Sequence, residues 1–399
     1  MDADVIVVGA GPAGLSIAIA LAQNGINVIC TGPQAFCLHT DEDAHTSLDT
    51  RTTALFSGSV DYLKQIGVWQ NCETIASPLK AIRIIDATSR FFRAPETLFH
   101  SCELNLPCFG YNISNQVLVQ NLHSTLLETS GVTYIKTQAV HNICIEDDKV
   151  EITLNEGQRL QAAMIIGADG RKSLCRSAAS IETLAWSYPQ VALACNFSHS
   201  KSHDFISNEF HTSVGPFTTV PLGPNQSSLV WVNTPEQSHY LMALDEVQFQ
   251  QKLESQLKGL LGQVTYTSKR SCFPLSSLTA KTFAKNKIAL VGEAAHVMPP
   301  IGAQGLNLGF RDCAALVECF ETAQIIDFSS SLPGILSAYN QKRRADVWSR
   351  TFAVDALNRS LLSGFLPLQA GRFIGLHLIN KISPLKRFVM RQGMQPNWS

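Results

Sequence analysis

The stretch that decides the fold is Asp4–Gly14, which reads DVIVVGAGPAG. Its opening, Asp4–Val8, is almost entirely apolar, which is typical of a strand buried on both faces of a parallel sheet. The glycine-rich segment Gly9–Gly14 follows, and apolar residues then recur at helical spacing as far as Gly25. A second apolar run, Ile26–Cys30, completes a strand–helix–strand unit of about 30 residues. The beginning of the chain therefore predicts a parallel α/β sheet.

The glycines of this first turn have the spacing of a dinucleotide-binding loop. Gly9 permits the tight turn, Gly11 lets a pyrophosphate approach the backbone, and Gly14 lets helix and strand pack closely. The helix that follows would present free N–H groups to phosphate charge. The acid expected about 20 residues further on, which accepts ribose hydroxyls, is replaced here by Thr31. The motif predicts a bound dinucleotide; a tight turn without a ligand is the alternative.

Two later segments repeat the pattern of a buried strand that ends in a glycine-containing turn. The first, Gly167–Arg176, contains Asp169-Gly170 and follows the apolar run Ala163–Ile166. The second, Val291–Asp312, places Gly302, Gly305 and Gly309 between a strand and a helix. Such spacing can expose backbone amides in a row, which suits an electron-rich ring edge.

Composition narrows the classes of function. The chain has 399 residues, enough for two or three domains, and only 16% of them are charged. The net charge of −1 gives no general attraction for nucleic acid. The eleven cysteines include no C-x-x-C pair, so neither a disulfide framework nor a zinc or other metal site is expected. Met1–Asp4 leads directly into a strand with no signal peptide, and no apolar run is long enough to span a membrane; a cytoplasmic protein is expected.

Changes of pattern along the chain suggest three regions. A dinucleotide-binding domain is assigned to residues 1–75, 101–182 and 275–330, and an antiparallel-sheet substrate domain to 76–100 and 183–274. Short strand-like segments between Pro/Gly/Asn/Ser turns support the second assignment. Residues 331–399 are expected to form a C-terminal helical region, because apolar residues recur at helical spacing as far as about Leu357.

These segments together resemble the group A flavoprotein aromatic hydroxylases, and within them the hydroxylases of ubiquinone biosynthesis (the UbiH/UbiF type). The resemblance extends from Asp4 to about Arg350 and is carried, besides Gly9–Gly14 and the Asp169-Gly170 pair, by Asp49–Leu55 with Ser57 and Ser59, Gly215-Pro216 before Val220–Leu222, and Gly302–Asp312. It implies a Rossmann-like FAD-binding domain of the glutathione-reductase type, with an inserted antiparallel sheet and C-terminal helices.

The resemblance also implies roles for individual residues. Gly9, Gly11 and Gly14 would hold the FAD pyrophosphate, Arg51 would reach the FAD, and Asn115 would be a further polar contact. Thr31 stands where the family has an acid for the adenosine ribose.

Three more segments complete the implied site. Asp169 would support the pyrophosphate and the passage of NAD(P)H. Glu293 replaces the family's ribityl-binding Asp with a stem one methylene longer. The tract that contains Gly302, Gly305, Leu306 and Asn307 would lie against the pyrimidine edge of the flavin.

The activity implied is hydroxylation of a polyprenylated phenol with FAD, NAD(P)H and O₂, through a C4a-hydroperoxyflavin. Two alternatives stay open. One is an FAD-dependent reductase or dehydrogenase of a polyprenyl or aromatic substrate. The other is a non-catalytic assembly subunit of the same fold, suggested by the changes at Thr31 and Glu293.

Several residues outside these motifs are weaker candidates. His296 is a candidate general base, although a structural hydrogen bond fits its place in a turn better; Asp355 and His211 are further possible bases. Phe210, Phe217 and Trp231 are expected either to wall the substrate site or to be plain core.

Two segments near the C-terminus are rich in basic residues, and their surroundings have to be predicted separately. Lys342–Arg344 is expected to be a solvated helix face. The basic and apolar stretch Leu361–Arg391 fits two interpretations, a helix packed on the FAD domain or peripheral contact with the inner face of a membrane, alone or within a ubiquinone-biosynthesis complex.

Overall fold

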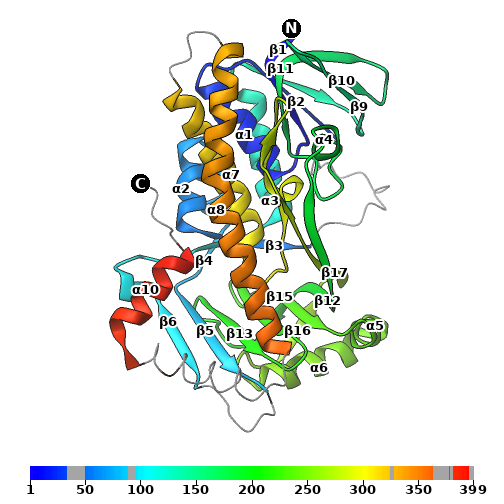
Figure 1. Cartoon of the computed structure of the whole chain (residues 1–399). Coiled ribbons are helices and arrows are strands. Elements are labelled where there is room, and N and C mark those ends of the chain that lie inside the picture. The colour runs from blue at the N-terminus through cyan, green and yellow to red at the C-terminus, as the bar shows by residue number, and fades with distance from the viewer. Residues whose placement is uncertain (34–49, 89–94, 324–327, 363–376, 378–380, 395–399) are drawn as a thin grey trace.

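The computed structural model describes residues 1–33, 50–88, 95–323, 328–362, 377 and 381–394. Within them the chain forms two large sheets, one above the other in Figure 1, joined by a three-stranded sheet and by one long helix. The expected α/β architecture is confirmed, with the nucleotide-binding pattern in the upper sheet and the inserted strands in the lower one.

The eight-stranded sheet is built around the first strand. Its order is β18 (Ala284–Lys285), β19 (Ile288–Leu290), β11 (Arg159–Gly167), β1 (Ala3–Val8), β2 (Val28–Gly32) and β8 (Val132–Lys136), with β9 (Val140–Ile145) and β10 (Val150–Leu154) attached beside β11. The pairs from β19 to β8 are parallel, and Val5, Ile6 and Val7 are fully buried. The apolar run thus became the central strand of a covered sheet, as parallel geometry requires.

Three helices pack together beside this sheet: α1 (Pro12–Gln23), α3 (Asn115–Glu128) and α7 (Gln304–Thr322). α1 begins with Pro12, whose missing N–H and fixed φ suit the first helical position. The short α4 (Leu174–Ala178) follows β11, and the single turn η3 (Gly292–Ala294) follows β19. The N-terminus of α1 and the turn η3 therefore meet α7 near Gly309 and Cys313, at the carboxyl ends of the parallel strands, where α/β sheets bind ligands.

The nine-stranded sheet forms the lower layer. Its order is β20 (His296–Val297), β17 (Ser271–Ala280), β12 (Thr183–His199), β15 (Gln226–Asn233), β14 (Pro216–Gly223), β13 (Ile206–His211), β5 (Ala81–Asp86) and β6 (Thr97–His100), with β16 (Val264–Thr267) beside β12. One pair, β13 with β5, is parallel, so the sheet is mixed and not purely antiparallel as expected. The expected boundary after residue 274 falls inside β17, which stays in this sheet until Ala280.

Helices α5 (Pro235–Ala243) and α6 (Glu246–Leu257) cover the face of this sheet that is turned away from the upper layer (Figure 1). Phe210, Phe217 and Trp231 are buried beneath them, with Phe249 of α6 in the same cluster. The three aromatic residues are therefore core, and the interpretation of them as walls of a substrate site is wrong.

The three-stranded sheet connects the two layers. It consists of β3 (Thr52–Phe56), β7 (Gly110–Ser114) and β4 (Ser77–Pro78), followed in the chain after β3 by α2 (Ser57–Gln65). The single turn η1 (Trp69–Asn71) comes between α2 and β4, and the single turn η2 (Ser101–Leu104) comes directly before β7. The Asn112 side chain of β7 donates to Pro221 O at 2.8 Å and to Ser228 Oγ at 3.2 Å, which ties this sheet to the lower one.

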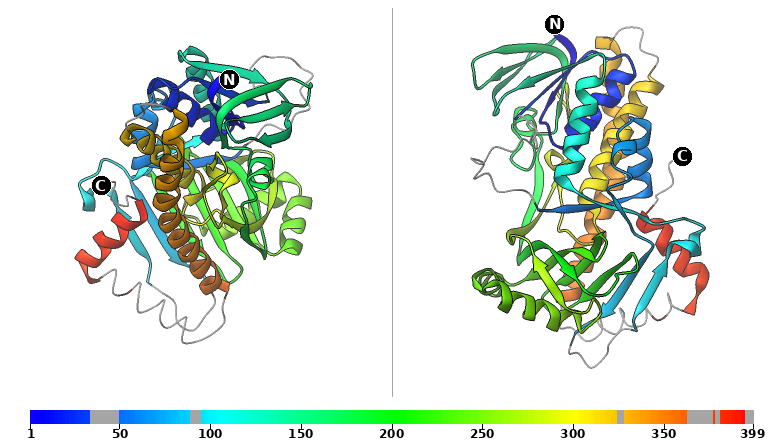
Figure 2. Two further views of the ribbon diagram at one scale, coloured as in Figure 1. Left: turned by 45° about the horizontal axis from the view of Figure 1, so that its top comes forward. Right: turned by 180° about the vertical axis from the view of Figure 1, so that it is seen from behind.

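The long helix α8 (Phe328–Leu362) runs past both layers, and α10 (Ser383–Met394) lies against the lower one (Figure 2). The buried positions of α8 recur every three or four residues: Leu332, Ile335, Tyr339, Arg343, Val347, Thr351, Val354 and Asn358. Arg343 belongs to this stripe with 4% of its surface exposed, so the expectation of a solvated Lys342–Arg344 face is wrong for its central residue. Ten of the eleven cysteines are described and free; Cys37 lies outside the described residues.

Candidate cofactor site

The three glycine segments that the sequence singled out are in contact with one another. A Cβ placed on Gly9 would lie 2.2 Å from Ala168 O, and one on Gly292 would lie 3.2 Å from the Ala13 Cβ. The Cys313 thiol on α7 donates to Ala13 O at 3.4 Å. Segments far apart in the chain thus form one floor at the carboxyl ends of β1, β11 and β19.

The glycines of the first loop, Gly9–Gly14, have different structural roles. Gly9, at φ +114°, and Gly14 have no room for a side chain, since a Cβ on Gly14 would lie 1.8 Å from Gly9 O. Gly11 is exposed, and a Cβ there would meet nothing within 4 Å. Gly9 and Gly14 therefore set the shape of the turn, while Gly11 opens the first amides of α1 to a ligand.

One carboxylate oxygen of Asp169 is hydrogen-bonded within the turn, and the other has no hydrogen-bond partner among the described residues. Its Oδ2 accepts the backbone N–H of Cys175 at 3.0 Å, and the buried Oδ1 is the other oxygen. A buried polar atom without a partner is costly, so this oxygen could accept a hydrogen bond from a hydroxyl of a bound ligand.

Arg51 and Asn115 come together at the start of β3 and α3. The backbone N–H of Asn115 donates to Arg51 O at 3.1 Å, and the buried Asn115 Oδ1 has no described partner. The exposed guanidinium of Arg51 lies 5.1 Å from the centre of the Phe273 ring on β17. This pair therefore stands where the upper and lower layers meet.

The tract at the start of α7 is held by the side chain of Asn307. Its Oδ1 accepts from Phe56 N at 2.8 Å and from Ser59 Oγ at 2.7 Å. Its Nδ2 donates to Ala54 O at 2.8 Å and to Ala303 O at 2.7 Å. Because these four bonds use the whole amide, the Asn307 side chain positions the tract and is not free to bind a cofactor.

The other residues of this tract leave space above them. Gly305 and Gly302 are exposed, and a Cβ on Gly305 would meet nothing within 4 Å. Gly305 and Leu306 belong to the first turn of α7, whose N–H groups have no partner within the helix. The tract is thus an open, amide-lined cradle.

Glu293 and Thr31 stand at the two positions where the resemblance led us to expect other acidic residues. The Glu293 side chain is exposed in the turn η3, beside the glycine floor. Thr31 is buried, and its hydroxyl donates to Val7 O at 3.3 Å. A contact between Thr31 and a ribose stays a prediction and would require this bond to be given up.

The candidate bases are all committed to partners. His296 is 1% exposed, and its Nε2 lies 2.6 Å from Asp312 Oδ2. His211 Nε2 lies 2.7 Å from Glu209 Oε1. Asp355 accepts from Trp186 Nε1 at 3.1 Å and from the Tyr188 hydroxyl at 2.7 Å. These contacts favour structural roles.

Asp312 is the buried charge that the sequence did not single out. Fully buried, it accepts from Gly292 N at 2.9 Å, and Arg343 Nε donates to its second oxygen at 2.7 Å. Burial by itself would raise the pKa of Asp312, but His296 and Arg343 hold that pKa below its usual value. The signal that could have revealed the pair is the position of Arg343 on the apolar stripe of α8.

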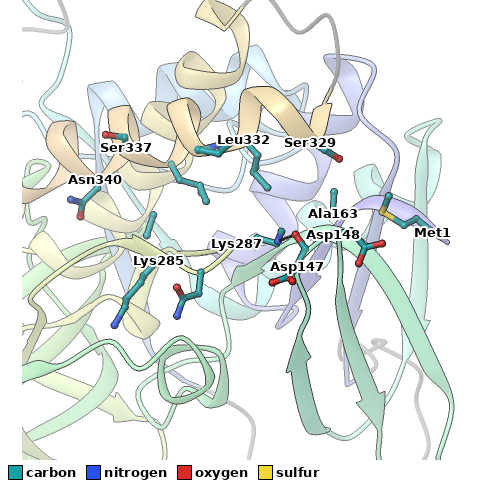
Figure 3. A pocket seen from close by; sticks show the side chains of 14 residues that line it. Met1, Asp147, Asp148, Ala163, Lys285, Lys287, Ser329, Leu332, Ser337 and Asn340 are labelled. Carbon is teal, nitrogen blue, oxygen red and sulfur yellow. Dashed lines mark hydrogen bonds between the residues drawn. The ribbon is translucent and has the colours of Figure 1, made fainter.

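A cavity of about 800 Å³ lies elsewhere, between the edge of the eight-stranded sheet and the beginning of α8 (Figure 3). Its lining includes Asp147, Lys285, Lys287 and Leu332, but no residue of the glycine segments. The Lys287 ammonium already donates to Glu146 O at 3.0 Å and to Asp147 O at 2.5 Å. This cavity is separate from the glycine floor.

Comparison with known proteins agrees with this geometry. A family model described as an FAD binding domain matches residues 2–351. The chain belongs to this FAD-binding family. It is 31% identical over 395 residues to the ubiquinone hydroxylase UbiL of Rhodospirillum rubrum, covering 98% of this chain and 89% of that one. It is 28% identical to the 3-demethoxyubiquinol 3-hydroxylase of Escherichia coli, covering 98% of each.

The fold of this FAD-binding protein is also found in solved structures. The p-nitrophenol 4-monooxygenase PnpA of Pseudomonas putida superposes with a TM-score of 0.77 at 18% identity, over 99% of each chain. The residues present fit FAD: open space above Gly11 and Gly305, free amides on two helices, and buried unpaired oxygens on Asp169 and Asn115. By its family and its hydroxylase relatives the chain is an FAD-dependent aromatic monooxygenase, and the solved structure shows the same fold.

Proposed function

We propose that this protein hydroxylates the aromatic ring of a polyprenylated phenol in ubiquinone biosynthesis, using FAD, NAD(P)H and O₂. The observation that carries the proposal is the likeness, over 98% of the chain, to two proteins named as ubiquinone-pathway hydroxylases. The convergence of three glycine segments on one floor supports the cofactor half of it.

The chain would hold FAD at two ends. Gly11 and the first amides of α1 would bind the pyrophosphate, with the Arg51 guanidinium as a further donor. Asp169 Oδ1 and Asn115 Oδ1 are acceptors, so they would take hydroxyl groups of the cofactor or a bridging water beside the pyrophosphate. The amides of Gly305 and Leu306 would face the pyrimidine edge of the ring, and the exposed carboxylate of Glu293 would face the ribityl chain. When bound, FAD supplies the electrons and the activation of O₂.

The substrate ring would lie between this cradle and the nine-stranded sheet. The face of the sheet opposite α5 and α6 carries Ser228, which contacts Asn112 of the upper part of the molecule. The same face carries an apolar cluster that includes Tyr188, Ala192, Val232 and Leu275. These four side chains are buried, so they back the substrate space and do not line it. Phe273, which pairs with Ala192 on the same face and is 36% exposed, would meet the phenol ring and help to exclude water, which protects an activated oxygen from wasteful release.

The most direct test is oxygen incorporation by the purified protein loaded with FAD. With NADH or NADPH, ¹⁸O₂ and a short-tailed polyprenyl phenol, we expect one labelled oxygen on the ring by mass spectrometry. Reduction of substrate without the label would indicate an FAD-dependent reductase or dehydrogenase. Failure to bind FAD at all would indicate a non-catalytic subunit.

The pathway is tested separately by deleting the gene. We expect a ubiquinone precursor lacking one ring hydroxyl to accumulate, and complementation with the wild-type gene to remove it. An accumulated compound from outside the quinone pathway would overturn the substrate assignment and leave the assignment of FAD intact. The electron donor is decided by which nicotinamide bleaches the flavin absorbance faster under anaerobic conditions.

We also infer that α10 rests on an anionic membrane surface. Lys386 anchors this helix by donating to Glu103 Oε1 at 2.7 Å and to Leu98 O at 2.8 Å, and Met390 is buried against Leu79 and Phe99. None of the helices within the described residues is long and apolar enough to cross a bilayer.

The outward side of α10 combines apolar and basic residues. Phe388 is 58% exposed and Val389 37% exposed, and Arg387 and Arg391 are exposed beside them. This combination suits the interface of an anionic bilayer. The rest of the stretch assigned to this contact, residues 363–376 and 378–380, lies outside the described residues.

Vesicle co-sedimentation of the full chain tests the membrane contact. Phe388→Asp is expected to lower binding to vesicles rich in anionic lipid about tenfold. Val247→Asp changes a side chain that is 62% exposed on α6 and is the matched control. Equal binding of the two variants would refute the contact.

A further inference from the structure

A chain of buried charges connects α8 to the flavin-facing tract at the start of α7. Asp346 on α8 accepts from Arg343 Nη1 at 2.6 Å, from Arg350 Nε at 3.1 Å and from Arg311 Nη2 at 2.6 Å. Arg343 also bonds to Asp312 on α7. Two carboxylates on neighbouring helices thus share three guanidinium groups.

Arg350 extends this cluster as far as the cradle. Its Nη1 donates to Gln304 Oε1 at 2.9 Å, and Gln304 Nε2 donates to Gly302 O at 3.0 Å. Gln304 is the first residue of α7. A side chain of α8 therefore holds, through a single glutamine, the loop that bears the free amides.

That loop requires such support. Gly302 has φ +65° and Ala303 has φ +52°, so a residue with a Cβ adopts the left-handed region directly before α7. This conformation costs a non-glycine residue roughly 1–2 kcal/mol. Asn307 fixes the loop from the side of β3, and Arg350 with Gln304 fixes it from the side of α8.

The cluster joins arginines and carboxylates of α7 and α8. Burial by itself would raise the pKa of Asp346, but Arg343 and Arg311 hold that pKa below its usual value. Arg311, Arg343 and Arg350 each pair with Asp346, and Arg343 also pairs with Asp312. Arg350 carries charge nearest to the cradle and is only 14% exposed, so water screens it weakly.

We propose that Arg350 is a positioning residue for the flavin: through Gln304 it fixes the Gly302–Gln304 loop, and its guanidinium places a positive charge behind the loop that would face the ring. A reduced flavin is anionic at its pyrimidine edge, so this charge would favour the reduced form over the oxidised one. The inference rests on the proposed function only for the binding of FAD.

Three variants of the FAD-loaded protein separate the two parts of this role. Arg350→Ala is expected to lower the affinity for FAD and to reduce the preference for reduced FAD by about threefold to tenfold, a fall in potential of about 14–30 mV for a two-electron couple. Gln304→Ala should lower the affinity but keep the preference, because the charge remains. Arg350→Lys should restore the preference.

Arg359→Ala is the matched control, because Arg359 pairs with Asp355 on the same helix at the same spacing, at 2.8 Å, and is 64% exposed. Spectroelectrochemical titration gives the potential, and FAD titration gives the affinity; neither requires turnover. A potential for Arg350→Ala equal to that of Arg359→Ala would overturn the inference. Oxygen incorporation could still establish hydroxylation in that case. Conversely, a protein that binds FAD but does not hydroxylate the phenol could still show the effect of Arg350 on the flavin potential.

Discussion

The two ends of the proposed cofactor site, named here by the part of FAD that each would bind, are shaped by different means. At the pyrophosphate end the absence of side chains decides the geometry. Only glycine fits at positions 9 and 14, because a Cβ at either would lie within 2.2 Å of a backbone oxygen. At the ring end, side chains from distant elements decide it: Asn307 bonds to β3, and Arg350 reaches Gln304 from α8. The first kind of geometry is local in sequence and the second is not.

The largest effect is expected from breaking the charge cluster of the ring end. Asp312→Asn keeps the shape of the side chain but removes the charge that faces Arg343, which is 4% exposed. A buried pair that loses one partner costs about 3 kcal/mol or more. Urea denaturation should report this loss in the free energy of unfolding. Arg359→Ala, at an exposed pair, should cost about 0.5 kcal/mol or less; equal losses would contradict the assignment.

The pyrophosphate end is tested by two alanines in one loop. Gly14→Ala should destabilise the protein by about 2–3 kcal/mol, because its Cβ would meet Gly9 O. Gly11→Ala meets open space and should leave the free energy of unfolding within about 0.5 kcal/mol. Denaturation of the FAD-free protein gives both values. If the two substitutions cost the same, steric exclusion does not shape this turn.

A smaller effect is expected where hydrogen bonds hold the ring end. Asn307→Asp keeps the acceptor for Phe56 N and Ser59 Oγ but loses both donated bonds to Ala54 O and Ala303 O. The expected cost is about 2 kcal/mol. Asn121→Asp, which loses one bond to Val117 O within α3, is the control and should cost less than half as much. The reverse order of the two losses would be inconsistent with the role given to Asn307.

Acid should weaken the ring end gradually. Burial by itself would raise the pKa of Asp312 and of Asp346. In the folded state His296 and Arg343 hold the pKa of Asp312 below its usual value, and Arg343 and Arg311 do the same for Asp346. The stability that these carboxylates contribute is therefore complete above the unfolded pKa of about 3.9 and is lost as the pH falls through the lower folded values. Denaturation midpoints between pH 7 and pH 3 should fall less for Asp346→Asn than for the wild type. Parallel pH profiles would show that Asp346 contributes nothing.

The same contrast explains what the sequence could predict. The strand–turn–helix at Asp4–Gly14 and the later turns are local patterns, so the α/β fold and the meeting of the glycine segments followed from them. The sequence could not tell whether Phe217 and Trp231 are core residues or line a substrate site, because an aromatic residue on a strand gives the same pattern in both cases. The packing of α5 and α6 against them shows that they are core.

Partners far apart in the chain account for the rest. Asp312, His296 and Arg343 are brought together by tertiary packing, and a basic triplet in sequence gives no sign that its middle member is buried. The parallel pair of β13 with β5 joins strands separated by more than a hundred residues. Helical phase along α8 was the one signal available for Arg343.

The central claim is that both ends grip one FAD, and titration of FAD against glycine variants tests it most directly. Gly11→Val and Gly305→Val place a side chain in the open space at either end, while Gly334→Val does so on α8, away from the cradle. We expect one FAD per chain for the wild type and for Gly334→Val, and an affinity at least about tenfold lower for each of the other two variants. Absence of FAD from the wild type, or equally tight binding by Gly305→Val and Gly334→Val, would contradict a single FAD held at both ends.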